Sequence, residues 1–410
     1  MAMKTNKKIY LLLVVFFIVY IGTGSVFALL GSAWPAISAD IAAPVSWQSI
    51  LIVIIYSAGA LGAATTQHVI ARFGNWAPVA FVLLVLTTIV FLFSSLRNFS
   101  LMPVICVFLG YFFTMSSTTI NGYAAKNYSP MLMSWLHCFF SLGSMISPVI
   151  LSYFILNKDS WRMGYQATGI LTGSILAVVL VSFPVWRAHG YPLFPNRKPD
   201  SAAANGAAPA AKAKSIRELM RLPGVAIMPV AMYFYCSVEV TIFFWAATYL
   251  TEAKGFAPGT AASLVAIVYG SQVAGRVAGG FATLKFSSRA VVRTGMAILI
   301  VSSVAFAFSP AALLKPSLAL LGFSLGPNYP LILSETPSLV GPGNSQGVIG
   351  LQMTAANIAS VTMPALLGAV ASYAGFGVFP VFMVALACAA FALKTIQNRT
   401  FGKIAGKGEA

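Results

Sequence analysis

Long apolar runs separated by short polar segments recur along the whole chain of 410 residues. A helix needs about 20 apolar residues to cross roughly 30 Å of hydrocarbon. Runs of this length predict twelve membrane spans, at residues 9–31, 46–69, 76–96, 101–123, 131–156, 163–186, 224–250, 259–284, 289–309, 312–334, 344–372 and 376–396. The hydrophobic pattern therefore predicts an all-α polytopic membrane protein.

The distribution of basic residues supports this number of spans and gives an orientation. With both termini in the cytoplasm, the outer side keeps five basic residues: Arg97, Lys158, Arg162, Lys254 and Lys315. The other 20 of the 25 Lys and Arg residues fall on the inner side or toward the inner end of a span. Such an excess marks cytoplasmic loops. One span more or fewer would destroy the asymmetry, so we expect a multi-pass protein with both termini cytoplasmic.

The chain divides into two similar halves. Residues 187–223 are rich in Pro, Ala and Lys, and we interpret them as a cytoplasmic linker with a short surface helix near Ser215 to Arg221. The segments YIGTGSVF (20–27) and YCSVEVTI (235–242) correspond to each other, as do LGYFF (109–113) and LGFSL (321–325). We therefore predict a six-helix bundle in residues 1–186, the linker, and a second bundle related by pseudo-symmetry in residues 224–410.

Composition excludes several classes of protein. The chain is 59% hydrophobic and 8% charged, too few charges for a soluble surface. Its net charge of +17 sits in short loops beside apolar runs, which favours a membrane-lipid surface rather than nucleic acid. The four cysteines show no metal-site spacing, and there is no P-loop. We expect no enzymatic activity, no cofactor and no metal.

Several segments resemble the major facilitator superfamily, whose fold consists of two six-helix bundles around a central cavity. In HVIARFGNW (68–76), Arg72 and Gly74 match the superfamily loop motif, while Ala71 replaces its acid and Asn75 its second base. In the second half, Gly275 and Arg276 match the corresponding pair. The segments 134–148, 236–250, 275–286 and 344–353 resemble bacterial sugar permeases of the fucose/glucose–proton symporter branch. The resemblance implies a bacterial inner-membrane protein, and we expect a monomer.

Glu239 is the outstanding candidate for chemistry because it lies near the middle of the seventh span. A charged side chain at such a depth costs about 2.5–3.5 kcal/mol on insertion scales, and therefore normally faces a cavity or a partner. A carboxyl group there is suited to exchange a proton. Its counterpart in the first half is Gly24, so the repeat itself does not require an acid. The alternative is a structural carboxylate, kept protonated or paired with Arg276. The two residues differ in depth, which disfavours a direct pair unless the seventh span is broken.

His137 is a second candidate for proton coupling, since histidine titrates near neutral pH. It lies about two turns into the fifth span, at a depth similar to that of Asn121 in the fourth. The alternative is a neutral histidine bonded to Asn121 or to a backbone carbonyl. Many relatives carry an acid in the fourth span, where this chain has Ser117, and Glu239 is thus expected to be the only deep carboxylate.

Other polar and aromatic residues are candidates for substrate binding or gating. Amides donate to and accept from hydroxyl groups, and aromatic rings stack on sugar faces; both also serve as packing between helices. The candidates for substrate binding are Asn121, Gln166, Trp245, Tyr249, Gln272, Asn328, Gln352 and Asn357. Arg72 and Arg276 are candidates for gating. Gly326, Pro327 and Pro330 are expected to bend the tenth span.

We therefore expect a proton-coupled symporter of a sugar or a related small polar solute that works by alternating access. Sodium coupling stays open, because one carboxylate does not distinguish Na⁺ from H⁺. The alternative is a drug or metabolite exporter that exchanges its substrate for protons, with a more apolar cavity. GSMISP (143–148) resembles a motif of such antiporters, with Ser147 in place of its second glycine. A sensor or scaffold without transport activity is a third hypothesis.

Overall fold

The computed structural model describes residues 7–128, 130–188 and 215–408. In the first half, the helices are α1 (Lys7–Asp40), α2 (Gln48–Phe73), α3 (Trp76–Ser95), α4 (Met102–Asn127), α5 (Pro130–Lys158), α6 (Trp161–Val181) and α7 (Phe183–Ala188). In the second half they are α8 (Ile216–Met220), α9 (Ile227–Glu252), α10 (Pro258–Ala282), α11 (Ser288–Phe308), α12 (Ala311–Leu325), α13 (Asn328–Val340), α14 (Pro342–Ala374) and α15 (Phe379–Gly408). The predicted all-α membrane fold is confirmed.

The tenth predicted span is broken rather than continuous. Eleven candidate spans in the described residues are long and apolar enough to cross a membrane, and α12 and α13 together form the twelfth crossing. Pro327 and Pro330 have no N–H to donate to the carbonyls of Phe323 and Gly326, so the helical ladder stops between the two helices. The expected bend is therefore a break at Gly326 and Pro327.

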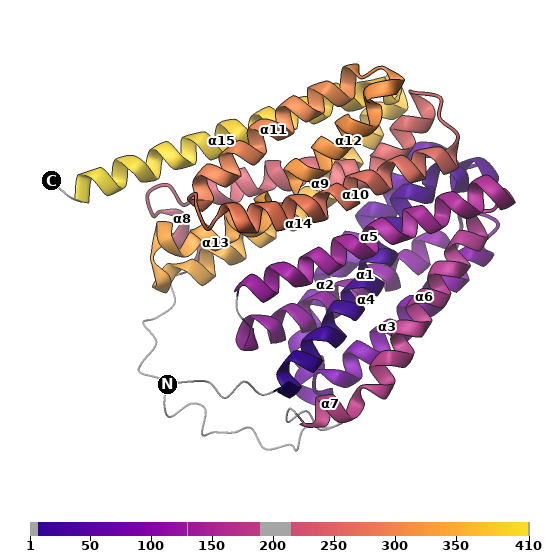
Figure 1. Ribbon diagram of the computed structural model, residues 1–410, viewed down its shortest axis with the longest axis horizontal. Coiled ribbons are helices and arrows are strands. Elements are labelled where there is room, and N and C mark those ends of the chain that lie inside the picture. Colours follow the sequence, from indigo (N-terminus) through magenta and orange to yellow (C-terminus); the bar gives the residue numbers. More distant parts are fainter. Residues whose placement is uncertain (1–6, 129, 189–214, 409–410) are drawn as a thin grey trace.

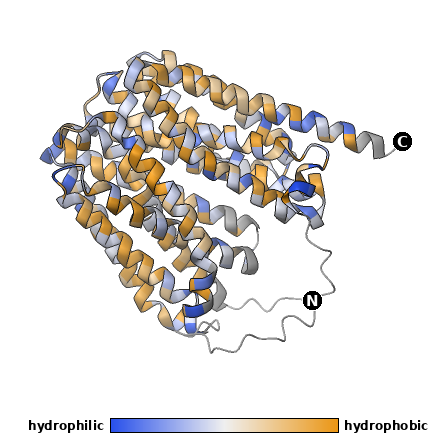
Figure 2. Cartoon of the chain, turned by 180° about the vertical axis from the view of Figure 1, so that it is seen from behind, coloured by the Kyte–Doolittle hydropathy of each residue, from blue (hydrophilic) through white to orange (hydrophobic). Residues whose placement is uncertain are grey.

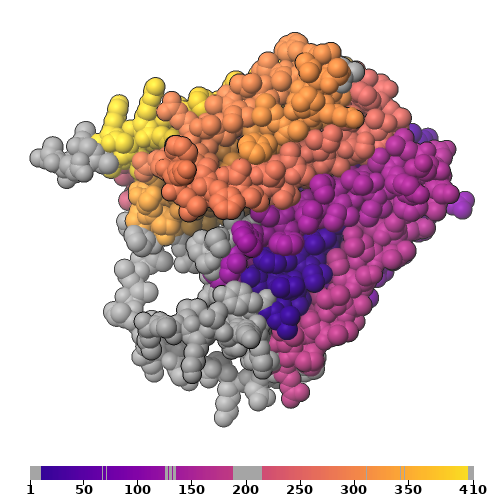
Figure 3. Space-filling model, viewed as in Figure 1, coloured from indigo at the N-terminus to yellow at the C-terminus, as the bar shows by residue number. Residues whose placement is uncertain are grey.

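The helices form two groups that lie against each other (Figure 1), with α1–α7 in one and α8–α15 in the other. Figure 3 shows the two groups in contact along a seam. The spatial repeat extends to single glycines. A Cβ on Gly110 of α4 would collide with the Ile55 carbonyl of α2, and one on Gly322 of α12 would collide with the Val268 carbonyl of α10. Equivalent helices thus approach closely at equivalent points in each group.

Polar and apolar residues lie on different parts of the helices. Figure 2 shows hydrophobic residues along most of the helix lengths and hydrophilic residues gathered at many of their ends, as membrane embedding requires. α1 begins and α15 ends at the same end of the molecule, which we call the terminal side; the opposite end is the far side (Figure 1). On the far side Arg162 pairs with Asp40 at 2.6 Å and donates to the Leu96 carbonyl.

The short helix predicted after the linker is confirmed as α8. Ser215 accepts from the Glu218 amide and the Glu218 carboxylate accepts from the Ser215 amide, a reciprocal capping box that starts a helix even on an exposed surface. Most of the predicted linker, residues 189–214, lies outside the described residues. The domain boundaries at 186 and 224 stay predictions.

Candidate functional site

Glu239 lies in the middle of α9, where only 8% of its surface is exposed. The Gln272 side-chain amide donates to its Oε1 at 2.6 Å. One Arg276 nitrogen lies 3.9 Å from the same oxygen. Both partners come from α10, so a single neighbouring helix supplies the polar surroundings that a buried carboxylate requires.

The same α10 residues also reach the other half of the molecule. Arg276 donates to the His137 backbone carbonyl at 2.6 Å and to the Ser141 hydroxyl, both on α5. Ser141 in turn donates to the side-chain amide oxygen of Gln272, its Oε1, at 3.1 Å. Glu239, Gln272, Arg276 and Ser141 therefore form one hydrogen-bonded and ion-paired group, the central network, which joins α9 and α10 to α5.

Helical spacing explains why these residues meet. Gln272 and Arg276 are four residues apart on α10, and His137 and Ser141 are four apart on α5, so each pair lies on one face of its helix. The break in the tenth span packs against the same turn of α10. A Cβ on Gly326 would collide with the Gln272 carbonyl and the Arg276 amide, so a side chain there would push the break away from the network.

The expectation that Glu239 and Arg276 differ too much in depth to pair is wrong. From the terminal side, Glu239 is about 18 Å and Arg276 about 9 Å along their helices at 1.5 Å per residue. α9 is nevertheless continuous, and the two side chains approach to 3.9 Å. The long arginine side chain extends far enough to cover this difference in depth. A comparison of backbone positions does not include the length of the side chain.

His137 contributes its backbone to the central network, and its ring lies among aromatic residues. The ring meets Tyr20 edge-on at 5.9 Å between centroids and lies 6.4 Å from Tyr329. Asn121 accepts a hydrogen bond from the Tyr20 hydroxyl at 2.7 Å and donates to Ser117 at 3.2 Å. Tyr20 thus takes the place beside Asn121 that the sequence suggested for His137.

Contacts between the two halves continue from the central network toward the far side. Phe27 of α1 packs on Phe243 and Phe244 of α9, with centroids 5.9 and 6.0 Å apart. Gln48 of α2 donates to the Phe244 carbonyl at 3.0 Å, and Gly31 allows α1 to touch the α9 backbone. Among the described residues, the hydrogen bonds and ring contacts between the halves lie at the level of His137 or farther toward the far side, which is therefore closed.

Four other candidates for substrate binding are buried in helix packing of the second half. Trp245 donates to the Pro364 carbonyl at 2.9 Å, and Tyr249 stacks on Phe379. Asn328 donates to the Ser324 carbonyl, and Gln352 accepts from Thr336. The structure does not bring these side chains to Glu239.

The remaining candidates lie on exposed surface. Gln166 shares a face of α6 with Met163 and Ile170, which are 39% and 64% exposed, as expected for a lipid-facing surface. Asn357 is exposed on α14, one turn after Met353, whose sulfur accepts from the Tyr329 hydroxyl. Arg72 is exposed at the end of α2, where Gly74 ends the helix with a φ of 71°. Of these three, Asn357 lies one helical turn from Met353, the residue that contacts Tyr329.

Sequence reasoning missed two features. Ser141 carries no signal of its own, although it follows His137 by one helical turn. Glu335 on α13 and Lys394 on α15 form an ion pair, and their side chains are 3% and 1% exposed. Glu239 stays the carboxylate farthest from the ends of its helix, but Glu335 is buried just as completely, which the sequence did not indicate. Glu335 lies near a helix end, and depth along the span did not reveal how completely neighbouring helices enclose it.

Comparisons with known proteins agree with this architecture. The family profile described as "Major Facilitator Superfamily" matches residues 12–364. A solved structure of a bacterial homologue of the human lysosomal transporter Spinster, in an inward-facing and unoccupied conformation, superimposes with a TM-score of 0.70. It shares 14% sequence identity, and the match covers 97% of this chain and 98% of that one. No curated protein matches the sequence.

Proposed function

The chain belongs to the major facilitator superfamily, and we propose that it imports a sugar or a related small polar solute together with a proton. Membership makes it a transporter with a small-molecule substrate, embedded in a membrane by many helices. The fucose/glucose–proton symporter branch, the bacterial inner membrane, cytoplasmic termini and a monomeric state belong to this proposal. Coupling by protons rather than by sodium also belongs to it.

One observation carries the proposal: Glu239 is buried in a network that crosses from one half of the transporter to the other. Protonation of Glu239 would remove the charge that attracts Arg276 and strengthens the bond from Gln272. Arg276 would then depend on α5 alone for its remaining partners. The protonation state of one residue thereby changes how the two halves are joined, which is what coupling of a proton to alternating access requires.

The surroundings of the central network suit a small polar ring. The rings of Tyr20 and Tyr329 both contact the His137 ring, and Asn121, which accepts from Tyr20 and donates to Ser117, adds an amide group that donates and accepts. Sugar hydroxyl groups need such mixed donors and acceptors, and the apolar ring faces pack on aromatic residues.

With the termini in the cytoplasm, the closed far side corresponds to an inward-facing state. Arg276 then acts as a gating contact and Arg72 lies at the cytoplasmic entrance.

The test begins with a thermal-shift screen of the purified protein against sugars, polyols, amino sugars, nucleosides and drugs. The solute that stabilises it is then used in proteoliposomes that contain a pH-sensitive dye. Symport acidifies the lumen when the solute is added outside, with no requirement for Na⁺. In Glu239→Gln we expect accumulation driven by a pH gradient to fall to background while solute exchange across the membrane continues. Accumulation at the wild-type level would exclude Glu239 as the coupling group.

The exporter hypothesis is kept because aromatic rings dominate the contact between the halves. Phe27, Phe113 and Phe140 pack together there with Phe243 and Phe244 beside them. Exchange of a hydrophobic drug for protons predicts stabilisation by drugs in the screen and an alkaline shift of the lumen when solute enters. The sign of the pH change therefore separates the two functions in one measurement.

A further inference from the structure

We propose that the second half binds an anionic phospholipid from the surrounding membrane, with its acyl chains beside α11 and its phosphate at Lys285, Arg289 and Arg293. The site lies outside the central network and does not depend on which solute is transported. Two cavities, the apolar surface around them and the adjacent basic residues carry the proposal.

Two cavities flank α11. One, of about 350 Å³, lies between α10 and α11 and reaches the break between α12 and α13. The other, of about 690 Å³, lies on a second face of α11, against α12 and α15. They share Ala290, Thr294 and Ile298, and we call the pair the α11 groove. Both volumes fall in the range of small-ligand pockets, roughly 300–1,000 Å³.

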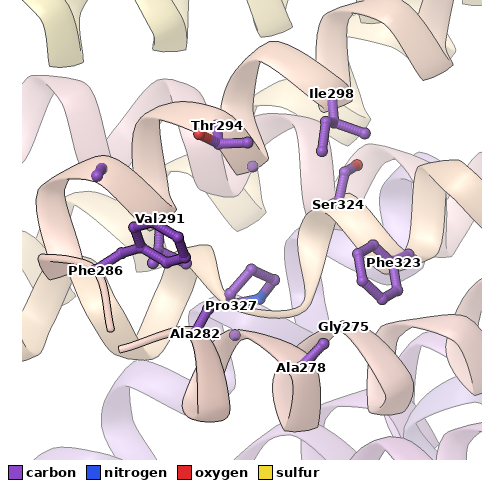
Figure 4. Close-up of a pocket in the computed structure, with 13 residues that line it drawn as sticks. Gly275, Ala278, Ala282, Phe286, Val291, Thr294, Ile298, Phe323, Ser324 and Pro327 are labelled. Atoms are coloured by element: carbon purple, nitrogen blue, oxygen red, sulfur yellow. The ribbon is translucent and has the colours of Figure 1, made fainter. Parts of the chain in front are cut away.

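The α11 groove is lined almost entirely by apolar groups. Figure 4 shows Ala278 and Ala282 of α10 facing Val291, Thr294 and Ile298 of α11, with Pro327 between the two helices. Around its mouth, large apolar side chains are exposed: Phe281 is 68%, Leu284 79% and Phe286 62% exposed. In a membrane-spanning protein such a surface faces hydrocarbon, so an acyl chain is the natural occupant.

Basic residues mark one end of the α11 groove. Lys285 lies in the turn before α11, and Arg289 and Arg293 follow at intervals of four residues in its first two turns. Arg293 also lines the larger cavity. In the ranges that the structure describes, the three form no ion pair with an acidic residue of the chain. Long basic side chains at a helix end extend toward the headgroup layer, where each gains from an anionic phosphate.

The charge at one end and the apolar lining along the rest match the two parts of a phospholipid. A free anion would use the basic residues and leave the cavities empty, whereas a neutral lipid would leave three positive charges without a partner. The occupant would also touch the break of the tenth span, because Pro327 and Ser324 line the smaller cavity. Gly279 of α10 packs against Pro327 at the same point, so the lipid lies beside the element that adjoins the central network.

Native mass spectrometry of the full chain in a neutral detergent tests the proposal. The probes are dioleoyl phosphatidylglycerol, dioleoyl phosphatidylcholine as its neutral counterpart, and glycerol phosphate as the headgroup without chains. We expect the anionic lipid alone to be retained. Each basic residue near an anionic headgroup contributes about fivefold in affinity. Lys285→Gln with Arg293→Gln should therefore weaken phosphatidylglycerol binding by about 30-fold.

Variants that fill the α11 groove test the acyl-chain part. Ala282→Phe blocks the smaller cavity and Thr294→Phe intrudes on both, so binding should fall at least tenfold in each; the second variant serves if the first unfolds. Two matched controls should retain affinity for phosphatidylglycerol. Ile170→Phe adds the same bulk on the exposed face of α6, and Arg97→Gln with Lys158→Gln removes two charges on the far side. Equal retention of phosphatidylcholine, equal binding of glycerol phosphate, or affinity within twofold of wild type in the charge or groove variants would overturn the proposal.

Discussion

Two buried carboxylates of the second half meet opposite kinds of surroundings. Glu335 pairs directly with Lys394, and both belong to the same helix group. Glu239 has no such close cation: an amide donates to it at 2.6 Å, and Arg276 stays 3.9 Å away while its donors bind α5 of the other group. Glu335 is thus neutralised within one half, whereas Glu239 depends on contacts that reach the other.

The difference shows that burial alone does not identify a coupling residue. Glu335 is 4% exposed and Glu239 8%, so burial would rank them in the wrong order for the function proposed here. A closed ion pair inside a rigid bundle resists protonation, because loss of one charge leaves the other uncompensated. A carboxylate with a neutral donor and a more distant cation can change charge with less loss.

The largest expected effect comes from breaking the closed pair. Lys394→Met leaves the Glu335 charge buried without a partner, and loss of one member of such a pair costs about 3–5 kcal/mol. The free energy of unfolding in detergent should fall by this amount, measured from the thermal unfolding midpoint. Lys394→Met combined with Glu335→Gln should recover much of the loss, because neither charge is then left alone. A single variant as stable as the wild type would show that the pair is not formed.

Arg276→Gln should have the next largest effect, because it removes the charged donor that joins α10 to α5. Hydrogen bonds to a charged group contribute about 1.5–3 kcal/mol, and Glu239 keeps its bond from Gln272. We expect a loss of about 2–3 kcal/mol in stability and loss of transport. Exposed Arg72→Gln is the matched control, and its stability should change by no more than about 0.5 kcal/mol. Equal effects of the two substitutions would contradict a special role for Arg276.

Two serines one turn apart on α5 allow a contact between the halves to be compared with a contact within one half. Ser141 joins Arg276 and Gln272, whereas Ser144 donates to the Gly24 and Phe140 carbonyls of its own half. Each alanine substitution should cost about 1 kcal/mol in unfolding experiments. Transport in proteoliposomes should fall in Ser141→Ala and persist in Ser144→Ala. Equal transport rates in the two variants would show that the Ser141 contact is only structural.

The smallest change in stability is expected for Glu239→Gln. A glutamine keeps an oxygen that accepts from Gln272, and the contact given up is the longer one to Arg276. Stability should change by no more than about 1 kcal/mol, while Glu335→Gln, which leaves Lys394 uncompensated, should cost several times as much. Unfolding midpoints measured side by side give the answer. Equal losses would place the two carboxylates in the same structural role.

The sequence predicted the helices better than it predicted their contacts. Apolar length gave the twelve crossings, and the prolines near residue 327 indicated the irregular tenth span, because these signals act within one helix. The candidate site was predicted in part. Glu239, Gln272 and Arg276 do lie together, while Trp245 and Tyr249, which follow Glu239 on the same helix, turn into packing of their own half.

Gly24 shows what the sequence repeat predicted about Glu239 and what it did not. Its position opposite Glu239 in the sequence repeat predicts that the acid occurs in one half only. The reason appears in three dimensions: a Cβ at Gly24 would collide with the Phe140 carbonyl of α5, so α1 has no room for any side chain there. One half uses the equivalent position for close helix packing, and the other uses it for a buried charge.

The sequence by itself determined that this chain spans a membrane as helices, where the tenth crossing is irregular and which acid lies deepest. These properties follow from hydrophobic length, missing backbone donors and position along one helix. Only the tertiary structure decided that Arg276 reaches Glu239, that Ser141 completes the link to the other half, and that Glu335 is neutralised by Lys394. Such pairings depend on the rotation of each helix and the reach of its side chains, and neither is fixed by the spacing of residues within one helix.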